Sequence, residues 1–186
     1  MKNKRCDWKS QNKELIKYHD NEWAKIIHND KILFENLILE TMQAGLSWLT
    51  ILLKREEFRK AFDDFNYNLI VNWNQNKIEE LLTNKNIIRN RLKIESVLSN
   101  SQNFIKIQKE FGTFDKYIWN FVQYQQIVNK WDEMSQIPSQ SELSLKISKD
   151  LKKRGFKFLG AVTVYSFLQA IGIINDHIND CFVKYL

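Results

Sequence analysis

The stretch DKILFENLILETMQAGLSW, residues 30–48, predicts a helix, a tight turn and the start of a second helix. Asp30 can cap the first helix, because its side chain can accept a hydrogen bond from a free backbone N–H group. Apolar residues then recur near helical spacing, at Leu33, Leu37 and Met42. Gly45 ends this helix, and Ser47 can cap a second one that runs from Trp48 to about Phe62.

Further helices are expected along most of the chain. Asn76 and Glu79 resemble a capping box that opens a short helix. After a few polar residues, another helix is expected from near Ile88 to beyond Leu98. The sequence therefore predicts a helix, a very short connection and a second helix at about residues 76–99.

The C-terminal third also has helical signals. Ser139 and Glu142 resemble a second capping box, and Gly155 would end the helix that follows. Residues 158–174 carry no formal charge, but polar side chains among them favour a buried core helix over a membrane span. Because no segment shows sustained alternation of apolar and polar residues, no strand is predicted, and the expected fold class is all-α.

Length and composition set wider limits. The chain has 186 residues, of which 44% are apolar and 13% aromatic, enough for the core of one compact domain spanning residues 1–186. One proline and five glycines exclude a Gly-rich phosphate loop and an all-β fold with many tight turns. Nothing in the sequence indicates oligomerisation, so we expect a monomer. The N-terminus does not read as a secretory signal, which predicts a cytoplasmic protein.

Metal-binding side chains gather at the two ends of the chain. They are Cys6, His19, His177 and Cys181, which include both cysteines and two of the three histidines. Two thiolates and two imidazoles form the ligand set of a closed structural zinc site. His177 and Cys181 are one helical turn apart, so a helix would direct both to one metal. Two alternatives remain at this point: buried free cysteines with surface histidines, or a disulfide between Cys6 and Cys181.

Positive charge is concentrated in two places. The first group surrounds the connection near residue 88 and comprises Lys85, Arg89, Arg91 and Lys93. The second comprises Lys146, Lys149, Lys152, Lys153, Arg154 and Lys157. Basic groups beside helix ends suit a nucleic-acid backbone, so we predict DNA contacts at Arg89, Arg91 and Lys153. The alternative is a solvated helix face.

One carboxylate and several aromatic residues suggest a ligand site. Glu40 lies late in the first helix and Trp48 lies just beyond the glycine turn, so the two side chains can converge on one cavity. The aromatic segments at residues 6–8 and 18–23 can close it. Each aromatic residue alone is more typical of a core. Together with the basic groups, they predict a base-sized slot beside a nucleic-acid-binding surface.

Six blocks of sequence resemble one known family. In order, they are Arg5-Cys6-Asp7-Trp8, Tyr18-His19-Asp20-Asn21-Glu22-Trp23, Leu39-Glu40 with Gln43-Ala44-Gly45-Leu46-Ser47-Trp48, Ile87-Ile88-Arg89-Asn90-Arg91, Lys152-Lys153-Arg154-Gly155-Phe156-Lys157-Phe158 and Asn175-Asp176-His177. Through them the chain resembles, nearly end to end, DNA-3-methyladenine glycosylase I. Members of that family are helix-hairpin-helix enzymes that remove N3-methyladenine from alkylated DNA.

The resemblance implies a fold and a set of site residues. It implies an all-α helix-hairpin-helix glycosylase fold, with the hairpin element at about residues 76–99. It implies a structural Zn²⁺ that joins the terminal segments through Cys6, His19, His177 and Cys181. It implies a base pocket formed by Trp8, Tyr18, Trp23, Glu40 and Trp48. It also implies a DNA-inserted turn formed by Gln43, Ala44, Gly45 and Leu46.

The implied activity is DNA repair by hydrolysis of the N-glycosidic bond of 3-methyladenine in double-stranded alkylated DNA. Such an enzyme would release 3-methyladenine and leave an abasic site. Glu40 is the expected catalytic residue, acting in recognition and electrostatic stabilisation more than as a base. Because no lysine lies in the pocket motifs as a Schiff-base nucleophile, we predict a monofunctional glycosylase.

Three positions depart from the family pattern. Leu15 stands where some members have a pocket tyrosine, Ala24 follows Trp23 where glycine is usual, and Asn86 replaces a common hairpin glycine. Two other functions compete with the glycosylase: a non-catalytic, zinc-stapled helical module that binds nucleic acid, and metal-dependent hydrolysis. The four-ligand site argues against hydrolysis, because it leaves no open position on the metal.

Overall fold

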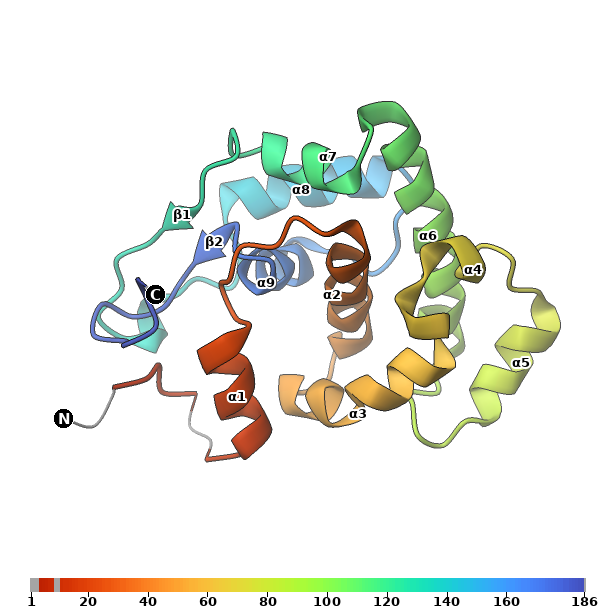
Figure 1. Cartoon of the computed structure of the whole chain (residues 1–186), viewed down its shortest axis with the longest axis horizontal. Helices are drawn as coiled ribbons and strands as arrows, with labels where there is room; N and C mark the ends of the chain where they lie inside the picture. The colour runs from red at the N-terminus through yellow and green to blue at the C-terminus, as the bar shows by residue number, and fades with distance from the viewer. Residues whose placement is uncertain (1–3, 9–10, 186) are drawn as a thin grey trace.

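The computed structural model describes residues 4–8 and 11–185, and this part of the chain is mostly helical (Figure 1). The helices are α1 Lys13–Asn21, α2 Asp30–Gln43, α3 Trp48–Ala61, α4 Tyr67–Ile70, α5 Gln75–Thr83, α6 Arg91–Phe111, α7 Phe114–Asn120, α8 Glu142–Lys153 and α9 Ala161–Ala170. Two short 3₁₀ helices occur at Asp63–Phe65 and Met134–Gln136. The mostly helical architecture agrees with the expected class.

One small feature departs from an all-α fold. Strand β1, Ile127–Val128, pairs in parallel with strand β2, Ile174–Asn175. Each strand has two residues, which is too short to produce a detectable alternation of apolar and polar side chains. The expectation that no strand exists was therefore wrong, and the pair joins the segment after α7 to the segment after α9.

Helix α2 lies at the centre of the molecule, where it contacts α3, α6, α7 and α9 (Figure 1). Residues 33–42 of this helix are all buried, so its apolar side chains face neighbours on every side. Each fully buried Leu, Ile or Phe contributes about 1.5–3 kcal/mol relative to exposure. The burial of α2 therefore fixes the position of its C-terminal end, which carries Glu40 and the turn 43–46.

Short polar side chains cap most of the α-helix N-termini in the described part of the chain. Ser47 caps α3 as predicted, with its hydroxyl accepting a hydrogen bond from the Thr50 N–H. Asparagine caps five helices in the same way, at Asn12, Asn29, Asn66, Asn74 and Asn90. Part of the abundant asparagine in this chain therefore has a structural role.

Asp30 has a different role from the one predicted. Asn29, not Asp30, caps α2, and Asp30 is the first residue of that helix. The Asp30 carboxylate instead accepts hydrogen bonds of 2.9 Å from the Phe114 N–H and 2.8 Å from the Asp115 N–H. A negative charge at this point also favours the positive end of the α7 dipole. Asp30 therefore joins α2 to α7, a tertiary contact that local sequence rules do not contain.

The predicted capping boxes were shifted from the true helix starts. Helix α5 is capped by Asn74 and α6 by Asn90, so the connection between these helices covers residues 84–90. Helix α8 is capped by Ser141, whose box partner is Ser144, two residues beyond each predicted position. Serine and asparagine recur so often in these segments that several registers satisfy the local capping pattern.

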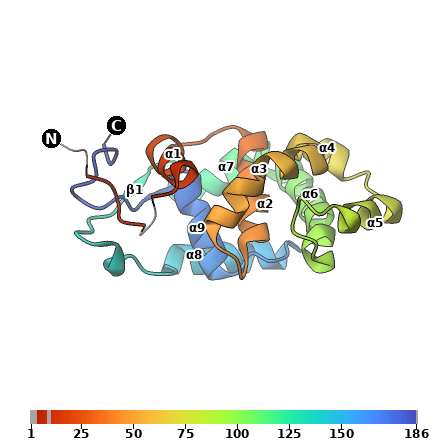
Figure 2. The ribbon, with the colours of Figure 1, turned by 90° about the horizontal axis from the view of Figure 1, so that it is seen from below.

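The uncharged segment 158–174 forms helix α9 and the start of β2. Half of the ten residues of α9 are buried and one is exposed, as expected of a core helix with one side lining a cavity. No helix among the described residues is long and apolar enough to cross a membrane. After α9 the chain returns toward the N-terminal segment, and both ends lie on the same side of the molecule (Figure 2).

Gly172, just after α9, occupies a position that no other residue type fits. Its φ is +76°, and a Cβ atom placed there would lie 2.4 Å from the backbone carbon and oxygen of Lys25. That contact is far closer than atoms tolerate, and backbone atoms cannot rotate away as a side chain can. The glycine therefore lets the end of α9 pack directly on the segment after α1.

We expect Gly172→Ala to destabilise the protein much more than Gly112→Ala. Gly112 also has a positive φ, +89°, but the atom nearest to its added Cβ would be Lys116 Nζ at 3.7 Å. In G112A the free energy of unfolding should therefore fall only by the cost of a left-handed backbone conformation, about 1–2 kcal/mol. In G172A the free energy of unfolding should fall by about 1–3 kcal/mol more, because the added methyl group overpacks against the backbone. Urea unfolding measures both values, and equal losses would contradict the proposed backbone clash.

Candidate active site and metal centre

A cavity of about 510 Å³ opens between helices α1, α2, α3 and α9. All five residues predicted to form the base pocket line it: Trp8, Tyr18, Trp23, Glu40 and Trp48. They come from the N-terminal segment, α1 and the turn after it, the end of α2 and the start of α3. The structure therefore brings together side chains that are up to forty positions apart in the sequence.

The Glu40 carboxyl group is buried and has no local counter-charge. The side chain is on the last turn of α2 with a relative exposure of 3%, and its Oε2 atom has no hydrogen-bond partner. Burial raises the pKa of Glu40 to about 8, because the charged form is poorly solvated. The group is therefore mainly protonated at neutral pH in the free protein, and it changes its charge readily when a cation approaches.

A second unsatisfied polar atom lies in the same cavity. The Trp48 indole Nε1 is buried without an acceptor, and among the described residues it and Glu40 Oε2 are the two buried side-chain atoms lacking a partner. Buried polar atoms are nearly always hydrogen-bonded, because an unpaired one costs about 1–3 kcal/mol. One donor and one acceptor without partners in one cavity indicate a polar ligand.

The cavity wall is a connected group of aromatic rings. Tyr18 contacts Trp8 at 6.1 Å and Trp48 at 5.2 Å between ring centroids. Trp8 also meets Trp23 edge to face at 5.0 Å. Such tilted pairs are a favourable arrangement of aromatic rings. The rings leave indole and phenol surface facing a space that suits a planar ligand.

Helix α9 supplies part of the wall that sequence reasoning missed. Tyr165, Ser166 and Gln169 line the cavity on the side of α9. The signal was present: these are polar residues in an otherwise apolar helix, with Gln169 one helical turn after Tyr165 and Ser166. Their polarity also argues against a membrane span. Met134, Ile137, Pro138 and Ser139 from the segment before α8 also line the cavity, and we find no sequence pattern that identifies them.

Asp176 holds this wall in place from behind. It is fully buried and accepts hydrogen bonds from Tyr165 at 2.6 Å and from Gln169 at 2.7 Å. Asn129 and Trp131 also donate to it, each at 2.7 Å. Four donors satisfy the buried carboxylate, so that it joins α9 to the segment after β1.

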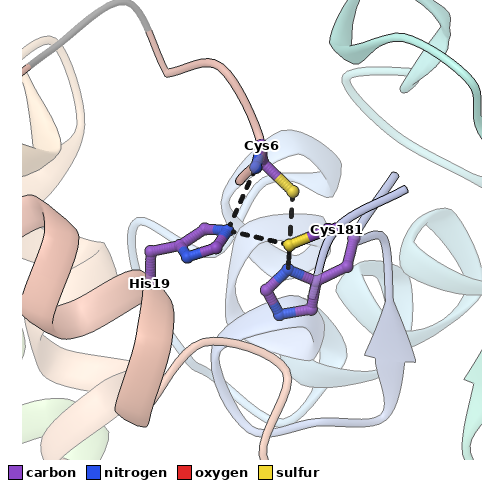
Figure 3. A group of neighbouring side chains, drawn as sticks. Cys6, His19 and Cys181 are labelled. Carbon is purple, nitrogen blue, oxygen red and sulfur yellow. Dashed lines mark hydrogen bonds between the residues drawn. The ribbon is translucent and has the colours of Figure 1, made fainter. Parts of the chain in front are cut away.

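The four predicted metal ligands converge at the chain ends. Cys6, His19, His177 and Cys181 are all buried, and their ligand atoms lie within 4.8 Å of one another. Figure 3 shows Cys6, His19 and Cys181 pointing toward a common centre. His177 and Cys181 are not on a helix, as their spacing suggested, but in the irregular segment after β2. Their shared direction comes from the turn and from packing against α1.

Each histidine presents one ring nitrogen to the cysteines and uses the other elsewhere. His19 Nδ1 bonds Asp20 at 2.8 Å, while Nε2 lies 3.5 Å from Cys181 Sγ. His177 Nε2 bonds the Trp23 carbonyl at 3.3 Å, while Nδ1 lies 3.4 Å from Cys181 Sγ. Carboxylate and carbonyl partners of this kind orient metal-bound histidines and fix their tautomers. The donor set and its surroundings therefore fit a metal ion.

The two cysteines are free and closely paired, which sets aside the disulfide alternative in this structure. The pKa of Cys181 lies well below its usual value because Cys6 donates a hydrogen bond to its sulfur and the two imidazoles face it. The pKa of Cys6 is raised for the reciprocal reason, the bond to Cys181. A site that already favours one thiolate is prepared for a cation.

Aromatic contacts join this metal centre to the cavity. Trp8 meets His19 at 5.2 Å between centroids, and Trp23 meets His177 at 4.6 Å. Trp8 and Trp23 are therefore shared by the cavity wall and the metal centre. Any change at the metal centre reaches two of the rings that shape the cavity.

The turn 43–46 is exposed beside the cavity. Ala44 and Gly45 are exposed, and Leu46 is an exposed apolar side chain at 41%. A second cavity of about 150 Å³ lies between this turn and the first turns of α9, and Glu40 lines both cavities. The turn therefore projects from the rim of the site that contains the buried carboxyl group.

The structure distinguishes among the predicted basic residues. Arg89 and Lys153 are exposed. Arg91 forms two hydrogen bonds of 2.8 Å with Glu79, so its charge is partly neutralised. Lys93 is buried, with 6% exposure. Basic residues that are close in sequence therefore differ in their access to a ligand.

The buried carboxyl group, the aromatic cavity and the exposed turn beside it together have the shape and polarity that a planar, polar ligand requires. Comparison with known proteins gives the family. The model of the methyladenine glycosylase family matches residues 8–184. This chain therefore belongs to the methyladenine glycosylase family.

Characterised relatives agree over nearly the whole chain. DNA-3-methyladenine glycosylase of Haemophilus influenzae is 40% identical, covering 95% of this chain and 96% of the relative. DNA-3-methyladenine glycosylase 1 of Escherichia coli is 41% identical, covering 95% of each chain. A solved structure of a 3-methyladenine DNA glycosylase I variant in complex with 3-methyladenine is 36% identical with a TM-score of 0.95, covering 98% of each chain.

We expect Glu40→Gln to change how the stability of the protein depends on pH. The folded-state pKa of about 8 lies above the usual 4.5, so Glu40 adds a penalty that grows as pH rises between these values. The variant and the wild type should differ little near pH 4.5, whereas E40Q should be about 1–3 kcal/mol more stable near pH 8. Urea unfolding across this range measures the difference. A difference that does not vary with pH would show that folded Glu40 has an ordinary pKa.

Proposed function

We propose that this protein is a monofunctional DNA glycosylase that removes 3-methyladenine from double-stranded alkylated DNA. The observation that carries the proposal is the pair of unpartnered polar atoms, Glu40 Oε2 and Trp48 Nε1, in an aromatic cavity. A purine presents both donors and acceptors on its edge, and its faces stack on aromatic rings. The relatives named above act on the same base, and one is solved with it.

The chemistry requires little of the protein beyond binding. An adenine alkylated at N3 is cationic while attached to the sugar, so its N-glycosidic bond is already weakened. When the C1′–N9 bond breaks, the electron pair goes to the base, which leaves neutral. Water then forms a bond to C1′ and loses a proton, leaving an abasic site. No proton needs to be delivered to the leaving group.

Glu40 would act through its charge. A cationic base near the buried carboxyl group lowers its pKa, so that the group ionises on binding. The resulting carboxylate would stabilise the positive charge that shifts to the sugar in the transition state. Trp8 and Trp48 would add cation–π attraction of about 0.5–2 kcal/mol for the alkylated base over normal adenine. Extrusion of the nucleotide costs a few kcal/mol, less for a damaged base.

The exposed turn would occupy the space left by the extruded nucleotide. Gln43 lines the main cavity, and it lines the smaller neighbouring cavity together with Ala44, Gly45 and Leu46, so insertion of the turn and entry of the base are geometrically compatible. The apolar Leu46 side chain would contact the bases on either side of the gap.

Two helix–helix connections would contact the DNA backbone. The predicted hairpin at about residues 76–99 contains α5, the connection 84–90 and the start of α6, with Arg89 exposed. Asn86, the departure in this connection, does not adopt a positive φ, so the glycine is not required. At the other connection, α8 ends with the exposed Lys153, and the N-terminus of α9 has no side-chain cap, so that its free N–H groups suit a phosphate.

We propose Zn²⁺ as the metal held by Cys6, His19, His177 and Cys181. Two sulfur and two nitrogen ligands are the preferred set for structural zinc, and four protein ligands leave no site for a reacting water. The metal would therefore fix the terminal segments and the two tryptophans that contact its histidines. Because thiolate ligands require reduced cysteines, we also propose that the protein acts in the cytoplasm. We propose separately that it acts as a monomer.

The alternatives explain less of the structure. A non-catalytic nucleic-acid-binding module would account for the basic residues and the metal centre. It would not account for a buried carboxyl group and an indole N–H left without partners in one cavity. Metal-dependent hydrolysis would require an open ligand position, and four buried protein ligands would leave none on a four-coordinate metal.

We expect the protein to release 3-methyladenine from methylated duplex DNA without strand cleavage. The rate should increase between about pH 6 and pH 8, because the carboxyl group ionises more readily as the solution becomes less acidic. Glu40→Gln should be at least about tenfold slower and independent of pH over this range. Chromatography of the released base measures the rate. Full activity in E40Q would remove Glu40 from the mechanism, and a borohydride-trapped adduct would contradict the monofunctional reaction.

We expect about one zinc per chain by elemental analysis, and a lower melting temperature after chelation or in Cys181→Ser. Removal of the metal should lower stability rather than abolish the reaction, so that metal-free protein that remains folded at low temperature, with Trp8 and Trp23 still in place, retains activity. His28→Ala provides a control, because His28 is an exposed histidine outside the metal centre. Loss of activity without loss of structure on chelation would instead indicate a catalytic metal.

A further inference from the structure

We propose that Lys93 is a positioning residue that holds the DNA-inserted turn and the end of α2 in the shape needed for excision. This inference rests on the glycosylase function proposed above. Lys93 lies in the first turn of α6, at the N-terminal end of that helix. Its position in the sequence, among Lys85, Arg89 and Arg91, suggested a phosphate contact, but the structure directs its ammonium group into the protein.

The contacts of Lys93 are with the backbone at the end of α2. Its Nζ donates hydrogen bonds to the Met42 carbonyl at 2.8 Å and to the Ala44 carbonyl at 2.6 Å. The last carbonyls of a helix have no partner within the helix, and a cation there also favours the negative end of the dipole. Gly45 and Leu46 follow immediately. The ammonium group therefore secures the start of the exposed turn.

The location of Lys93 is unfavourable for its own helix. A cation in the first turn of α6 faces the positive end of that helix dipole. Burial away from water also disfavours the charged form, and no carboxylate bonds this ammonium in the described structure. The contacts across to α2 offset these costs. Such a residue contributes to the geometry of α2 more than to the stability of α6.

This arrangement connects the hairpin to the reactive site. The connection 84–90 leads directly into the turn of α6 that carries Lys93, and Lys93 bonds the helix end that carries Glu40, two residues before Met42. Lys93 would thus fix the distance between the hairpin, which holds the DNA backbone, and the turn, which enters the gap in the DNA. A shift of about 1 Å in such positioning can reduce a rate by about a hundredfold.

The test is Lys93→Met, which keeps much of the side-chain length and removes the charge and its hydrogen bonds. Single-turnover release of 3-methyladenine from methylated duplex DNA should fall about ten- to a hundredfold. Affinity for free 3-methyladenine should be retained, because Lys93 does not line the cavity. Lys106→Met is the matched control: it changes an exposed lysine on the same helix and should act as the wild type.

Two measurements separate positioning from phosphate contact. Binding to a duplex with an abasic-site analogue should depend on salt equally in K93M and the wild type, whereas Lys153→Met should lower the slope of log K against log salt by about one. With 2-aminopurine beside the analogue, fluorescence should report weaker insertion of the turn in K93M. Lys93→Gln keeps a neutral donor group, so its insertion of the turn should be intermediate between that of K93M and that of the wild type.

Three results would overturn the proposal. Wild-type release by K93M would show that the contacts do not position the turn. A slope reduced by about one in K93M would identify a phosphate contact. Loss of 3-methyladenine binding in both K93M and K93Q would show that Lys93 supports the whole cavity. If wild-type protein itself releases no 3-methyladenine, the proposed function fails, and that outcome is distinct from the three above.

Discussion

The proposed site depends on a carboxyl group kept out of water at the end of a central helix. A buried carboxyl group with one unpartnered oxygen is unfavourable by about 1–3 kcal/mol, and among the described residues no neighbouring charge offsets this for Glu40. The long apolar body of α2, buried along residues 33–42, offsets the cost and prevents the helix end from moving into solvent. Glu40 is thereby held where its proton affinity responds to a cationic ligand, which is the property that the proposed chemistry requires.

The metal centre and the cavity are parts of one assembly. Trp8 and Trp23 contact the histidines of the metal centre and also line the cavity, so the chain ends contribute to the site as well as to stability. Asp176, next to His177, bonds Tyr165 and Gln169 on the opposite wall. A metal at the chain ends would thus restrain two walls of the cavity without taking part in the reaction.

Much of the site could be predicted from residue types and their order. The apolar stretch, Gly45 and Ser47 correctly indicated two helices around a turn, and both cysteines with two histidines indicated a common cluster. These features depend on local backbone preferences and on ligand chemistry, which the sequence states directly. Helix starts were less accurate, because Asn and Ser occur at several adjacent positions that satisfy the same capping pattern.

What the sequence by itself determined was which groups are present: a helical chain, a metal-binding set, and a carboxylate and indole near one turn. What only the tertiary structure decided was which groups face each other. Asp30 bonds the N-terminus of a distant helix, and Lys93 turns away from solvent to bond the end of α2. Local rules cannot predict these contacts, because the partner of each charge lies at least forty-nine positions away and is selected by the packing of whole helices.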